Sequence, residues 1–511
     1  MPSLTLACVA SPEPFETPQP PSASQLALLQ EQAIRRLAPV LATLQELGDL
    51  FCDGGHELAL VGGPVRDAFL GRDLTDVDLT TSASPEQSER LLTRWGGTTW
   101  DIGRAFGTIG AHRRGMQVEV TTYRADSYDR TTRKPQVAFG DCLQDDLRRR
   151  DFTVNAMALR LPELEFVDPY GGLTALAARV LDTPATPQES FADDPLRMMR
   201  AARFTAQLDF DLAPRVREAI PALAEQMRIV SAERIREELV KLLAAEHPVK
   251  GLRILTDSGL AGVMLPELPA LQLEIDEHHH HKDVYEHSLT VLTQAIELEG
   301  PRIVAGLGQT TPVATPDVTL RLAALLHDIG KPATRRFESN GGVSFHHHEV
   351  VGAKLARRRM KALRFSKDEI RDVTRLVELH LRFHGYGTGE WTDSAVRRYI
   401  TDAGPLLSRL HLLTRADCTT RNRRKAASLA RTYDDLEVRI GSLLAREKLD
   451  AVRPELDGNQ IAIVLGIAPG PVLGRAYKHM LAYRLDQGEV GEQGASEELR
   501  RWWVQQPESA S

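Results

Sequence analysis

The spacing of apolar residues changes along the chain. Between Glu57 and about Leu181, short apolar runs alternate with stretches of helical periodicity. The runs "ELALVGG" and "DVDLTT" are typical of strands, and "FGTIGA" and "QVEVTTYR" of a hairpin that turns at Arg114 and Gly115. This part of the sequence predicts a small domain in which strands and helices alternate.

After Phe191 the periodicity becomes helical almost without interruption, as in "DDPLRMMRAARFTAQL" and "ERIREELVKLLAAE". Breaks rich in Gly and Pro at "MLPELPAL" and "GQTTPVATPD" predict a domain boundary and a surface loop. The opening segment "SPEPFETPQPPSAS" is rich in Pro, Ser and Thr, which is typical of disorder. The fold class predicted is therefore α+β, with a mixed head followed by an all-α remainder.

Composition restricts the class of protein. A chain of 511 residues with 42% hydrophobic residues is expected to form several domains with their own cores. A net charge of -7 argues against a wholly basic nucleic-acid coat protein, so any nucleic-acid contact is expected to be local. The four cysteines form no CxxC pair, which favours a reducing compartment and predicts a cytoplasmic protein. No apolar run is long enough to span a membrane.

The stretch "LVGGPVRDAFLGRDLTDVDLTT" contains candidate nucleotide-binding residues. It lacks both GxxxxGK[ST] and GxGxxG, which excludes a P-loop and a dinucleotide fingerprint. Gly62 and Gly63 are predicted to end a strand and open a helix, where backbone amides can approach phosphate oxygens, and Arg66 follows about one turn later. This arrangement suits a triphosphate.

Two aspartates in the same stretch are candidate metal ligands. Asp76 and Asp78 lie two residues apart on a predicted strand, so their side chains share a face and can hold the same divalent ions. The alternative is a DxD that only caps a turn. Glu119 in "VEVTTYR" is a further candidate carboxylate, with a solvated strand position as the alternative.

Arginines follow in two clusters. In "RRRDFTVNAMAL", guanidinium groups suit phosphate oxygens and Asp or Asn suits ribose hydroxyls, although an internal salt-bridge network is the alternative. In "DDPLRMMRAARF", charged residues recur every three positions, which on a helix places them along one face. A solvated basic face is the alternative, but the apolar residues between them indicate a packed helix. An Asp and an Arg can also offer acceptor and donor edges that mimic a base pair. The candidates are Arg149, Arg150, Asp151, Asn155, Asp194, Arg197, Arg200 and Arg203.

The helical region contains a set of histidines and aspartates within otherwise apolar segments. Imidazoles and carboxylates from several helices are how a helical bundle binds divalent ions. The sequence does not decide which of His346, His347 and His348 points inward. The run His278 to His281 is expected on a surface connection without a catalytic role. The candidates are His287, His327, Asp328, His348, His380 and Asp417.

The order "GGPVRD", "DVDLTT", "RRDFTVN", "DPYGG", "DDPLRMMRAARF", "ERIREEL" resembles the class II CCA-adding enzyme and bacterial poly(A) polymerase family from about Leu58 to Leu243. The resemblance implies a polymerase-β-like nucleotidyltransferase head with a small mixed sheet, followed by an all-α neck, body, HD domain and tail. The boundaries expected are 1–25 for a disordered tail, 26–190 for the head, 191–275 for a neck that binds RNA and nucleobase, 276–425 for the HD domain and 426–511 for a helical tail.

The same resemblance implies roles for the candidates. It assigns Mg²⁺ to Asp76 and Asp78, and nucleotide contacts to Gly63 and Arg66. Ribose or phosphate contacts fall to Arg149, Arg150, Asp151 and Asn155, base selection to Asp194 and Arg197, and support of the nucleotide to Arg200 and Arg203. The chain has Asp193 where the family usually has Glu, a conservative departure. "RADSYDRTTRKP" resembles the family's mobile loop, and the segment from Leu456 to Val490 resembles its tRNA-gripping tail.

The His-Asp pair followed by Gly-Lys resembles an HD-superfamily domain. This second resemblance implies that His287, His327, Asp328 and Asp417 bind a divalent ion and that His348 and His380 are optional ligands of a second one. In tRNA-processing relatives such a domain can hydrolyse 2',3'-cyclic or phosphorylated RNA ends. Retention as a structural element is the alternative.

We therefore expect an enzyme that adds C, C and A to tRNA 3' ends from CTP and ATP without a nucleic-acid template. Its expected partners are tRNA, CTP and ATP, without a membrane or a stable protein partner. The closest alternative is a poly(A) polymerase, but those enzymes tend to carry a second basic residue in a Gly-basic-basic-Phe run where this chain has Ala105. Further alternatives are an HD phosphohydrolase with a nucleotide-binding head and a non-catalytic RNA-binding module.

Overall fold

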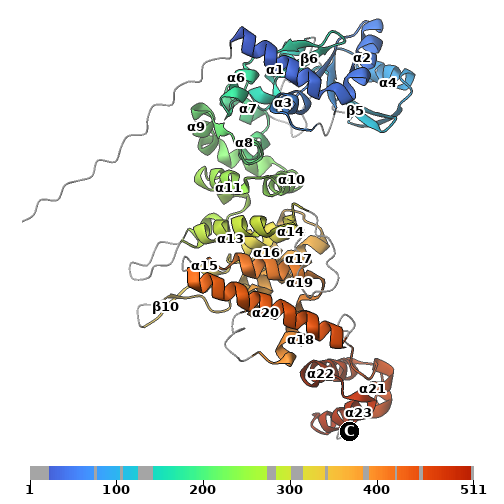
Figure 1. Cartoon of the computed structure of the whole chain (residues 1–511), viewed down its shortest axis with the longest axis vertical. Helices are drawn as coiled ribbons and strands as arrows, with labels where there is room; N and C mark the ends of the chain where they lie inside the picture. Colours follow the sequence, from blue (N-terminus) through green and yellow to red (C-terminus); the bar gives the residue numbers. More distant parts are fainter. Residues whose placement is uncertain are drawn as a thin grey trace, which may run out of the picture. The chain divides into compact units, whose positions relative to one another are not determined.

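The computed structural model describes residues 22–73, 77–103, 107–124, 142–272, 283–300, 315–339, 343–383, 391–419, 423–447 and 453–507. The chain divides into two compact units, residues 1–230 and 231–511 (Figure 1). Several features considered in the sequence lie outside the described residues, namely Asp76, Ala105, the run His278 to His281 and most of the segment that resembles a mobile loop.

A seven-stranded sheet forms the centre of the first unit, in the order β3-β4-β5-β2-β1-β6-β7. Strands β2 and β5 pair in parallel and the other neighbours are antiparallel, which confirms the predicted small mixed sheet. The strands are β1 (Leu58–Val61), β2 (Asp78–Thr81), β3 (Thr98–Gly103), β4 (Thr108–Arg113), β5 (Met116–Thr122), β6 (Ala158–Leu161) and β7 (Glu165–Val167).

The predicted hairpin is β4–β5. Its turn lies at Arg114 and Gly115, which have φ angles of 51° and 85°, and glycine adopts such angles without steric cost. Strands β1 and β2 also follow the sequence pattern. Strands β3, β6 and β7 were not predicted from the sequence; β3 begins with three polar or aromatic residues.

Helices cover the sheet unevenly. Helices α2 (Ala38–Asp53) and α4 (Pro85–Arg94) pack on one face, where Ala111 and Val118 are buried. On the other face, Leu143 and Leu147 of helix α5 (Leu143–Arg148) pack against Ala59, Val61 and Ala158, which belong to strands β1 and β6. On this second face the strands β2, β5 and β4 present exposed side chains at Asp78, Glu119 and His112.

Helix α8 (Leu196–Leu208) carries the second arginine cluster. Its Met198, Met199, Ala201 and Ala202 are buried, as expected of a packed helix rather than a solvated basic face. The helix begins after Asp194, whose Oδ1 accepts a hydrogen bond from the backbone N–H of Leu196 at 3.2 Å. Asp194 therefore lies before the helix and not on its charged face, in contrast to the predicted stripe. The rest of this unit contains α1 (Ala23–Arg36), α3 (Gly63–Leu70), α6 (Gly172–Ala177), α7 (Pro187–Asp193) and α9 (Pro214–Leu223), and β8 (Val180–Leu181) paired with β9 (Asp211–Leu212).

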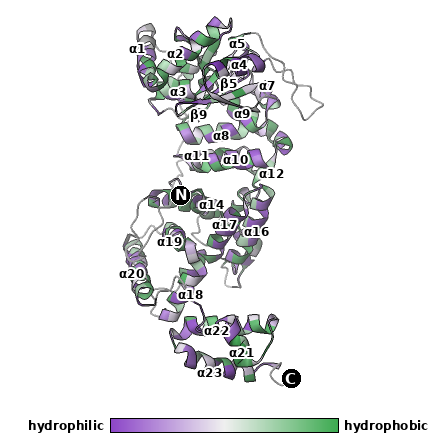
Figure 2. Cartoon of the chain, turned by 90° about the vertical axis from the view of Figure 1, so that its right-hand side faces the viewer, coloured by the Kyte–Doolittle hydropathy of each residue, from purple (hydrophilic) through white to green (hydrophobic). Residues whose placement is uncertain are grey.

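The second unit is helical in its described residues apart from one short hairpin, β10 (Arg336–Phe337) with β11 (Val343–Ser344). Most of its helices carry hydrophobic and hydrophilic positions side by side, as amphipathic helices do (Figure 2). None of the described helices combines the length and apolar character needed to cross a membrane. The helices are α10 (Ala232–Leu243), α11 (Pro248–Asp257), α12 (Leu260–Met264), α13 (Val284–Leu298), α14 (Val318–Leu326), α15 (Lys331–Thr334), α16 (His348–Ala362), α17 (Lys367–Leu379), α18 (Asp393–Ala403), α19 (Leu407–Ala416), α20 (Arg423–Glu447), α21 (Gly458–Leu465), α22 (Pro471–Gln487) and α23 (Gly491–Val504).

Two groups of helices stand out in this unit. Helices α13, α14, α16, α17 and α19 pack together and bring the histidines into one place. Helices α21 to α23 have their own apolar core, built from Ile461, Met480 and Leu499 among others.

Candidate active site and metal centre

Two carboxylates lie side by side on neighbouring strands of the head. Asp78 on β2 is the register partner of Glu119 on β5, so both side chains leave the same face of the sheet, and both are exposed. Carboxylate oxygens are the ligands that Mg²⁺ prefers, so this pair fits a divalent ion. Asp76 lies outside the described residues, and its part in the site stays a prediction. The sequence left Glu119 open because alternation alone cannot tell a ligand from a solvated strand residue.

The glycine turn lies at the end of strand β1. Gly62 has a φ angle of 74° and precedes helix α3 (Gly63–Leu70), as predicted from the sequence. A Cβ atom at position 62 would lie 2.9 Å from Nη1 of Arg150, so this guanidinium group lies directly against the turn. Nη1 of Arg66 donates to Oδ1 of Asn155 at 2.6 Å. The structure thus brings Gly62, Gly63, Arg66, Arg150 and Asn155 together.

Buried carboxylates fix the arginines. Both oxygens of Asp146, which is fully buried, accept hydrogen bonds, one from Arg149 at 2.5 Å and the other from Arg150 at 3.2 Å. Asp151 is also buried, and its Oδ2 accepts from Arg200 at 2.5 Å while its Oδ1 accepts from Asn155 at 2.9 Å. Burial alone would raise the pKa of Asp151, but the Arg200 charge and the hydrogen bonds outweigh it and lower the pKa. Asp151 therefore takes part in the internal network that was the alternative reading of this cluster.

The arginines of helix α8 have different environments. Arg197 donates to Oγ of Ser190 at 3.0 Å and to the backbone carbonyl of Arg149 at 2.6 Å, which connects it to the first cluster. Arg203 is buried, donates to Gln207 at 2.6 Å and lies 3.9 Å from the centre of the Phe204 ring. The structure places Asp194 next to Arg197, since the N–H of Arg197 donates to the Asp194 carbonyl at 2.9 Å.

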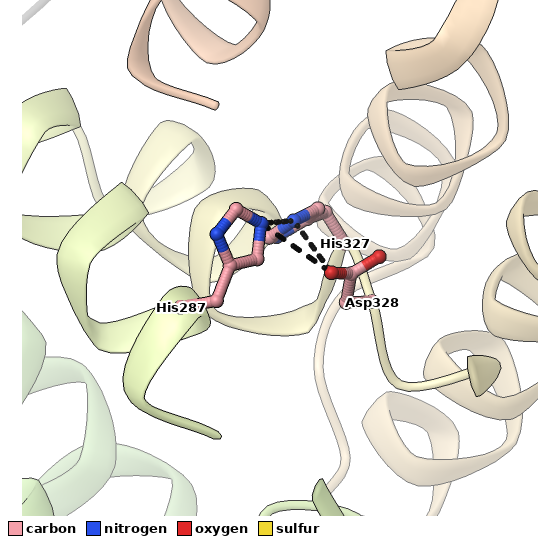
Figure 3. A group of neighbouring side chains, drawn as sticks. All are labelled: His287, His327 and Asp328. Carbon is pink, nitrogen blue, oxygen red and sulfur yellow. Dashed lines mark hydrogen bonds and ion pairs between the residues drawn. The ribbon is translucent and has the colours of Figure 1, made fainter. Parts of the chain in front are cut away.

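The second unit contains a compact group of histidines and aspartates. His287 on α13, His327 at the end of α14 and the adjacent Asp328 form one potential ligand set, with their ligand atoms within 4.8 Å of one another (Figure 3). Asp328, His348 and His380 form a second set, so that Asp328 belongs to both. Oδ2 of Asp328 lies 3.2 Å from Nε2 of His327, and Oδ1 lies 3.2 Å from Nε2 of His348. Two ions that share Asp328 as a bridging ligand fit this geometry.

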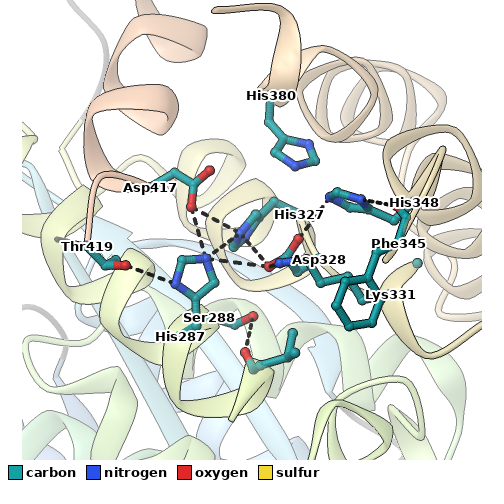
Figure 4. A network of polar contacts seen from close by, with 12 residues as sticks. His287, Ser288, His327, Asp328, Lys331, Phe345, His348, His380, Asp417 and Thr419 are labelled. Carbon is teal, nitrogen blue, oxygen red and sulfur yellow. Dashed lines mark hydrogen bonds and ion pairs between the residues drawn. The ribbon is translucent and has the colours of Figure 1, made fainter. Parts of the chain in front are cut away.

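The remaining predicted ligand completes the first set. Oδ1 of Asp417 lies 2.9 Å from Nε2 of His287 and 3.6 Å from Nε2 of His327 (Figure 4). The structure also answers which histidine of the "HHH" run points inward: His348 is buried toward Asp328, whereas His346 and His347 are exposed. All six residues predicted from the sequence are therefore brought together.

Backbone carbonyls orient three of these imidazoles. Nδ1 of His327, His348 and His380 lies 2.7–2.8 Å from the carbonyl oxygen of Ala324, Phe345 and Val377, respectively, which leaves each Nε2 for the centre of the cluster. Nε2 of His380 is buried and has no hydrogen-bond partner among the described residues. Burial lowers the pKa of His380 to about 3, which favours the neutral imidazole that a metal ligand requires. An ion would satisfy this otherwise unpaired nitrogen.

Comparisons with known proteins agree with this architecture. Family models match three segments: the poly A polymerase head domain at residues 58–182, the probable RNA and SrmB-binding site of polymerase A at 209–271, and the HD domain at 284–422. A Bacillus stearothermophilus CCA-adding enzyme solved with CTP is similar in structure, with a TM-score of 0.65 over 91% of this chain and 97% of that one, at 22% identity. A Thermotoga maritima CCA-adding enzyme solved with tRNA gives a TM-score of 0.56 over 93% and 98%, at 18% identity. These two likenesses show the fold.

Relatives with higher sequence identity show the family as well as the fold. The CCA-adding enzyme of Levilactobacillus brevis is 40% identical over 223 residues, 43% of this chain, and the match spans only about half (53%) of that enzyme. The A-adding tRNA nucleotidyltransferase of Deinococcus radiodurans is 32% identical over 458 residues, which are 88% of this chain and 96% of the relative. Because this last similarity extends over nearly all of both proteins, the chain belongs to the class II CCA-adding enzyme and bacterial poly(A) polymerase family of nucleotidyltransferases.

Proposed function

We propose that this enzyme adds C, C and A to the 3' ends of tRNA from CTP and ATP without a nucleic-acid template. The observation that carries the proposal is the pairing of Asp78 with Glu119 on one exposed face of the head sheet, next to the glycine turn that Arg150 covers. The similarity to CCA-adding enzymes that were solved with CTP and with tRNA supports the same reading.

Each group in the head has a chemical task in the transfer. The RNA 3'-oxygen forms a bond to the α-phosphorus of the nucleotide, the bond to pyrophosphate breaks, and the hydroxyl proton leaves to water. Asp78 and Glu119, together with Asp76, would hold Mg²⁺, which when bound lowers the pKa of that hydroxyl and screens the phosphate charge. The amides of the glycine turn and the guanidinium of Arg150 bind the triphosphate and hold the leaving group in place.

Base selection is proposed for Asp194 and Arg197, which are joined through their backbones before and within α8, because a carboxylate and a guanidinium can offer acceptor and donor edges to a base. Arg197 is held by Ser190 and by the backbone of Arg149. This contact connects the base-selecting residues to the phosphate-binding arginines. Asp151 acts through Arg200 and Asn155, whose positions it fixes.

One observation favours a second candidate function, the addition of only the terminal A to a tRNA that already ends in CC. The relative that matches 88% of the chain is an A-adding enzyme, whereas the CCA-adding relative from L. brevis matches 43%. Two tRNA substrates separate the candidates, one that lacks all of CCA and one that ends in CC. An enzyme that adds CCA extends the first with CTP and ATP together, whereas one that adds only A extends only the second. A long A tail on either substrate with ATP alone would indicate a poly(A) polymerase instead.

The catalytic assignment predicts the effect of Asp78→Ala. We expect nucleotide incorporation to fall by at least about 1,000-fold, because one metal ligand at the reacting phosphate is lost. Incorporation is measured with labelled ATP on a tRNA that ends in CC, and circular dichroism verifies the fold. A folded Asp78→Ala enzyme that retains a tenth of wild-type activity would contradict the assignment.

For the second unit we propose two divalent ions, one held by His287, His327, Asp328 and Asp417 and the other by Asp328, His348 and His380. The shared carboxylate and the inward-facing Nε2 atoms support this division. Such a pair of ions suits hydrolysis of a phosphate ester on an RNA end. Lys331 donates to Oδ2 of Asp328 at 2.7 Å and lies at the edge of the cluster, where an ammonium group can also meet a phosphate oxygen.

A further inference from the structure

A continuous row of residues crosses the open half of the head sheet. Trp100 on β3 is the register partner of Gly110 on β4, Gly110 is the partner of Glu119 on β5, and Glu119 is the partner of Asp78 on β2. Register partners point to the same face of a sheet, so the Trp100 indole and the two carboxylates occupy one surface. The row thus begins at an aromatic ring and ends at the proposed metal ligands.

Gly110 allows the indole to lie across the sheet. A Cβ atom at position 110 would overlap the Trp100 ring, with Cε2, Nε1 and Cζ2 as its nearest neighbours. The ring therefore covers the Gly110 backbone on the face that also carries Glu119. Adjacent strands are about 4.8 Å apart, so Gly110 lies two strand spacings, roughly 10 Å, from Asp78.

The described positions in the row next to this ring are exposed. Thr98, His112 and Gln117 form the next row on the same face, and all three are exposed, while Trp100 itself is partly exposed. On the opposite face, the neighbouring positions Ala111 and Val118 are buried where α4 packs. The indole thus lies over Gly110 on an exposed face, where the strand pattern places polar residues.

The in-line geometry of the transfer indicates which substrate contacts this surface. The triphosphate-binding turn and Arg150 lie beyond Asp78 on the β1 side. In phosphoryl and nucleotidyl transfer the attacking oxygen and the leaving group are roughly in line across the phosphorus. With the leaving pyrophosphate on the β1 side, the 3'-hydroxyl reaches the metal ligands from the β5–β4–β3 side, where the row leads to Trp100.

We propose that Trp100 stacks against the base of the 3'-terminal nucleotide of the acceptor RNA, so that the 3'-hydroxyl of that nucleotide rests at Asp78 and Glu119. This inference rests on the proposed function. The roughly 10 Å between ring and metal ligands accommodates the sugar of one nucleotide together with the ion. Base–aromatic stacking tolerates every base, which suits an enzyme whose substrate end changes with each addition.

The test uses a tRNA that ends in CC and a matched tRNA whose 3'-terminal cytosine base is missing while its ribose and 3'-hydroxyl remain. Both candidate functions include addition of A to the intact substrate. In Trp100→Leu we expect KM for the intact tRNA to rise about 10-fold and KM for ATP to stay unchanged, because stacking on RNA is lost. For the wild type, KM should be about 10-fold higher for the abasic tRNA than for the intact tRNA. For Trp100→Leu, the two tRNAs should have the same KM.

Three further variants separate stacking from structure. Trp100→Phe keeps an aromatic face and should retain most of the discrimination between the two tRNAs. Gly110→Ala should displace the indole and reproduce the effect of Trp100→Leu. Trp95→Leu removes a tryptophan from the other face, where Arg113 lies 5.0 Å from its ring centre, and should leave the discrimination intact.

Specific results would overturn the inference. A rise in KM for ATP with no change for tRNA would mean that Trp100 meets the incoming base. If the abasic tRNA raises KM by the same factor in the wild type and in Trp100→Leu, Trp100 does not touch the terminal base. If the wild type adds no A at all, the proposed function fails. Equilibrium binding of the intact and abasic tRNAs to the wild type and Trp100→Leu then tests the stacking contact by itself, and an equal affinity ratio for both proteins would overturn it.

Discussion

At the scale of single residues, Asp151 shows how a buried carboxylate contributes to a site without facing the substrate. Both of its oxygens are occupied, one by Arg200 and the other by Asn155, and Asn155 in turn accepts from Arg66. Removal of the charge therefore leaves buried donors without their acceptor, which costs more free energy than loss of a hydrogen bond at the surface.

This network predicts a pH-dependent effect of Asp151→Asn. The folded-state pKa of Asp151 is lowered below the value of about 3.9 for an unfolded chain, so its stabilisation is complete above about pH 5 and is lost as pH falls through the folded pKa. We expect the variant to be about 2–3 kcal/mol less stable at pH 7, and the difference to shrink as pH falls from about 4 toward 2. Thermal unfolding of the wild type and the variant at pH 7 and at about pH 2 measures the difference in stability.

Asp209→Asn is the matched control, because its pair with Arg179 is exposed and should contribute less than about 1 kcal/mol. A difference between wild type and Asp151→Asn that stays constant from pH 7 to pH 2 would contradict the prediction.

Residue identity was more predictable than residue direction. The sequence identified all six residues of the histidine and aspartate group in the second unit, called the HD cluster below. His and Asp are rare in apolar helices unless they serve a function. It could not choose His348 among three adjacent histidines, since that choice depends on where α16 begins. Nor could it show that Asp146 would hold Arg149 and Arg150, because the burial of Asp146 depends on tertiary packing.

At the scale of elements, a buried ion pair joins three helices of the second unit. Arg321 on α14 pairs with Glu299, which follows α13, and also donates to the backbone carbonyls of Leu243 and Ala245 at the end of α10. These carbonyls are groups that an α-helix leaves without an internal partner at its end. One guanidinium thus fixes the end of α10 against two helices of the HD cluster.

We expect Arg321→Ala to lower the stability of the second unit by about 3–5 kcal/mol, because Glu299 and the helix-end carbonyls would stay buried without a donor. Arg253→Ala is the control: Arg253 on α11 forms a two-pronged pair with Glu286 on α13, but that pair is about half exposed and should contribute about 0.5–1 kcal/mol. Urea unfolding followed by circular dichroism measures both. Equal effects of the two substitutions would contradict the assignment.

Elements with strong periodicity were predictable and short ones were not. Strand β1 follows its continuous apolar run, the hairpin β4–β5 follows its apolar alternation, and α8 follows its helical spacing. Strand β3 was not predicted because "TTWDIG" contains only two large apolar residues, and its strand conformation is stabilised by pairing with β4. The sequence therefore contained no sign that Trp100, which lies on β3, shares a face with Asp78 and Glu119.

At the scale of the whole molecule, the two proposed chemistries lie in separate compact units. Asp78 and Glu119 belong to the first, and the HD cluster belongs to the second. The structure therefore supports two centres that can be inactivated one at a time.

We expect Asp328→Ala to lose both ions of the HD cluster, because Asp328 is common to both ligand sets, while A addition to tRNA changes less than about twofold. Asp78→Ala should show the reverse pattern. Metal content after gel filtration, measured by mass spectrometry, and the incorporation assay give the two readouts. Loss of incorporation in a folded Asp328→Ala protein would contradict the independence of the two centres.

The pairing of β1 with β6 has a consequence for synthesis of the protein. Leu58 pairs with Leu161 and Val61 with Ala158, so the partner leaves the ribosome about 100 residues after β1. At about 5–20 residues per second this delay is on the order of 5–20 seconds. During that time a fully apolar strand has one open edge, which is a site for pairing with other nascent chains. Faster or slower translation of the segment between β2 and β6 should therefore change the yield of folded protein without any change in its amino-acid sequence.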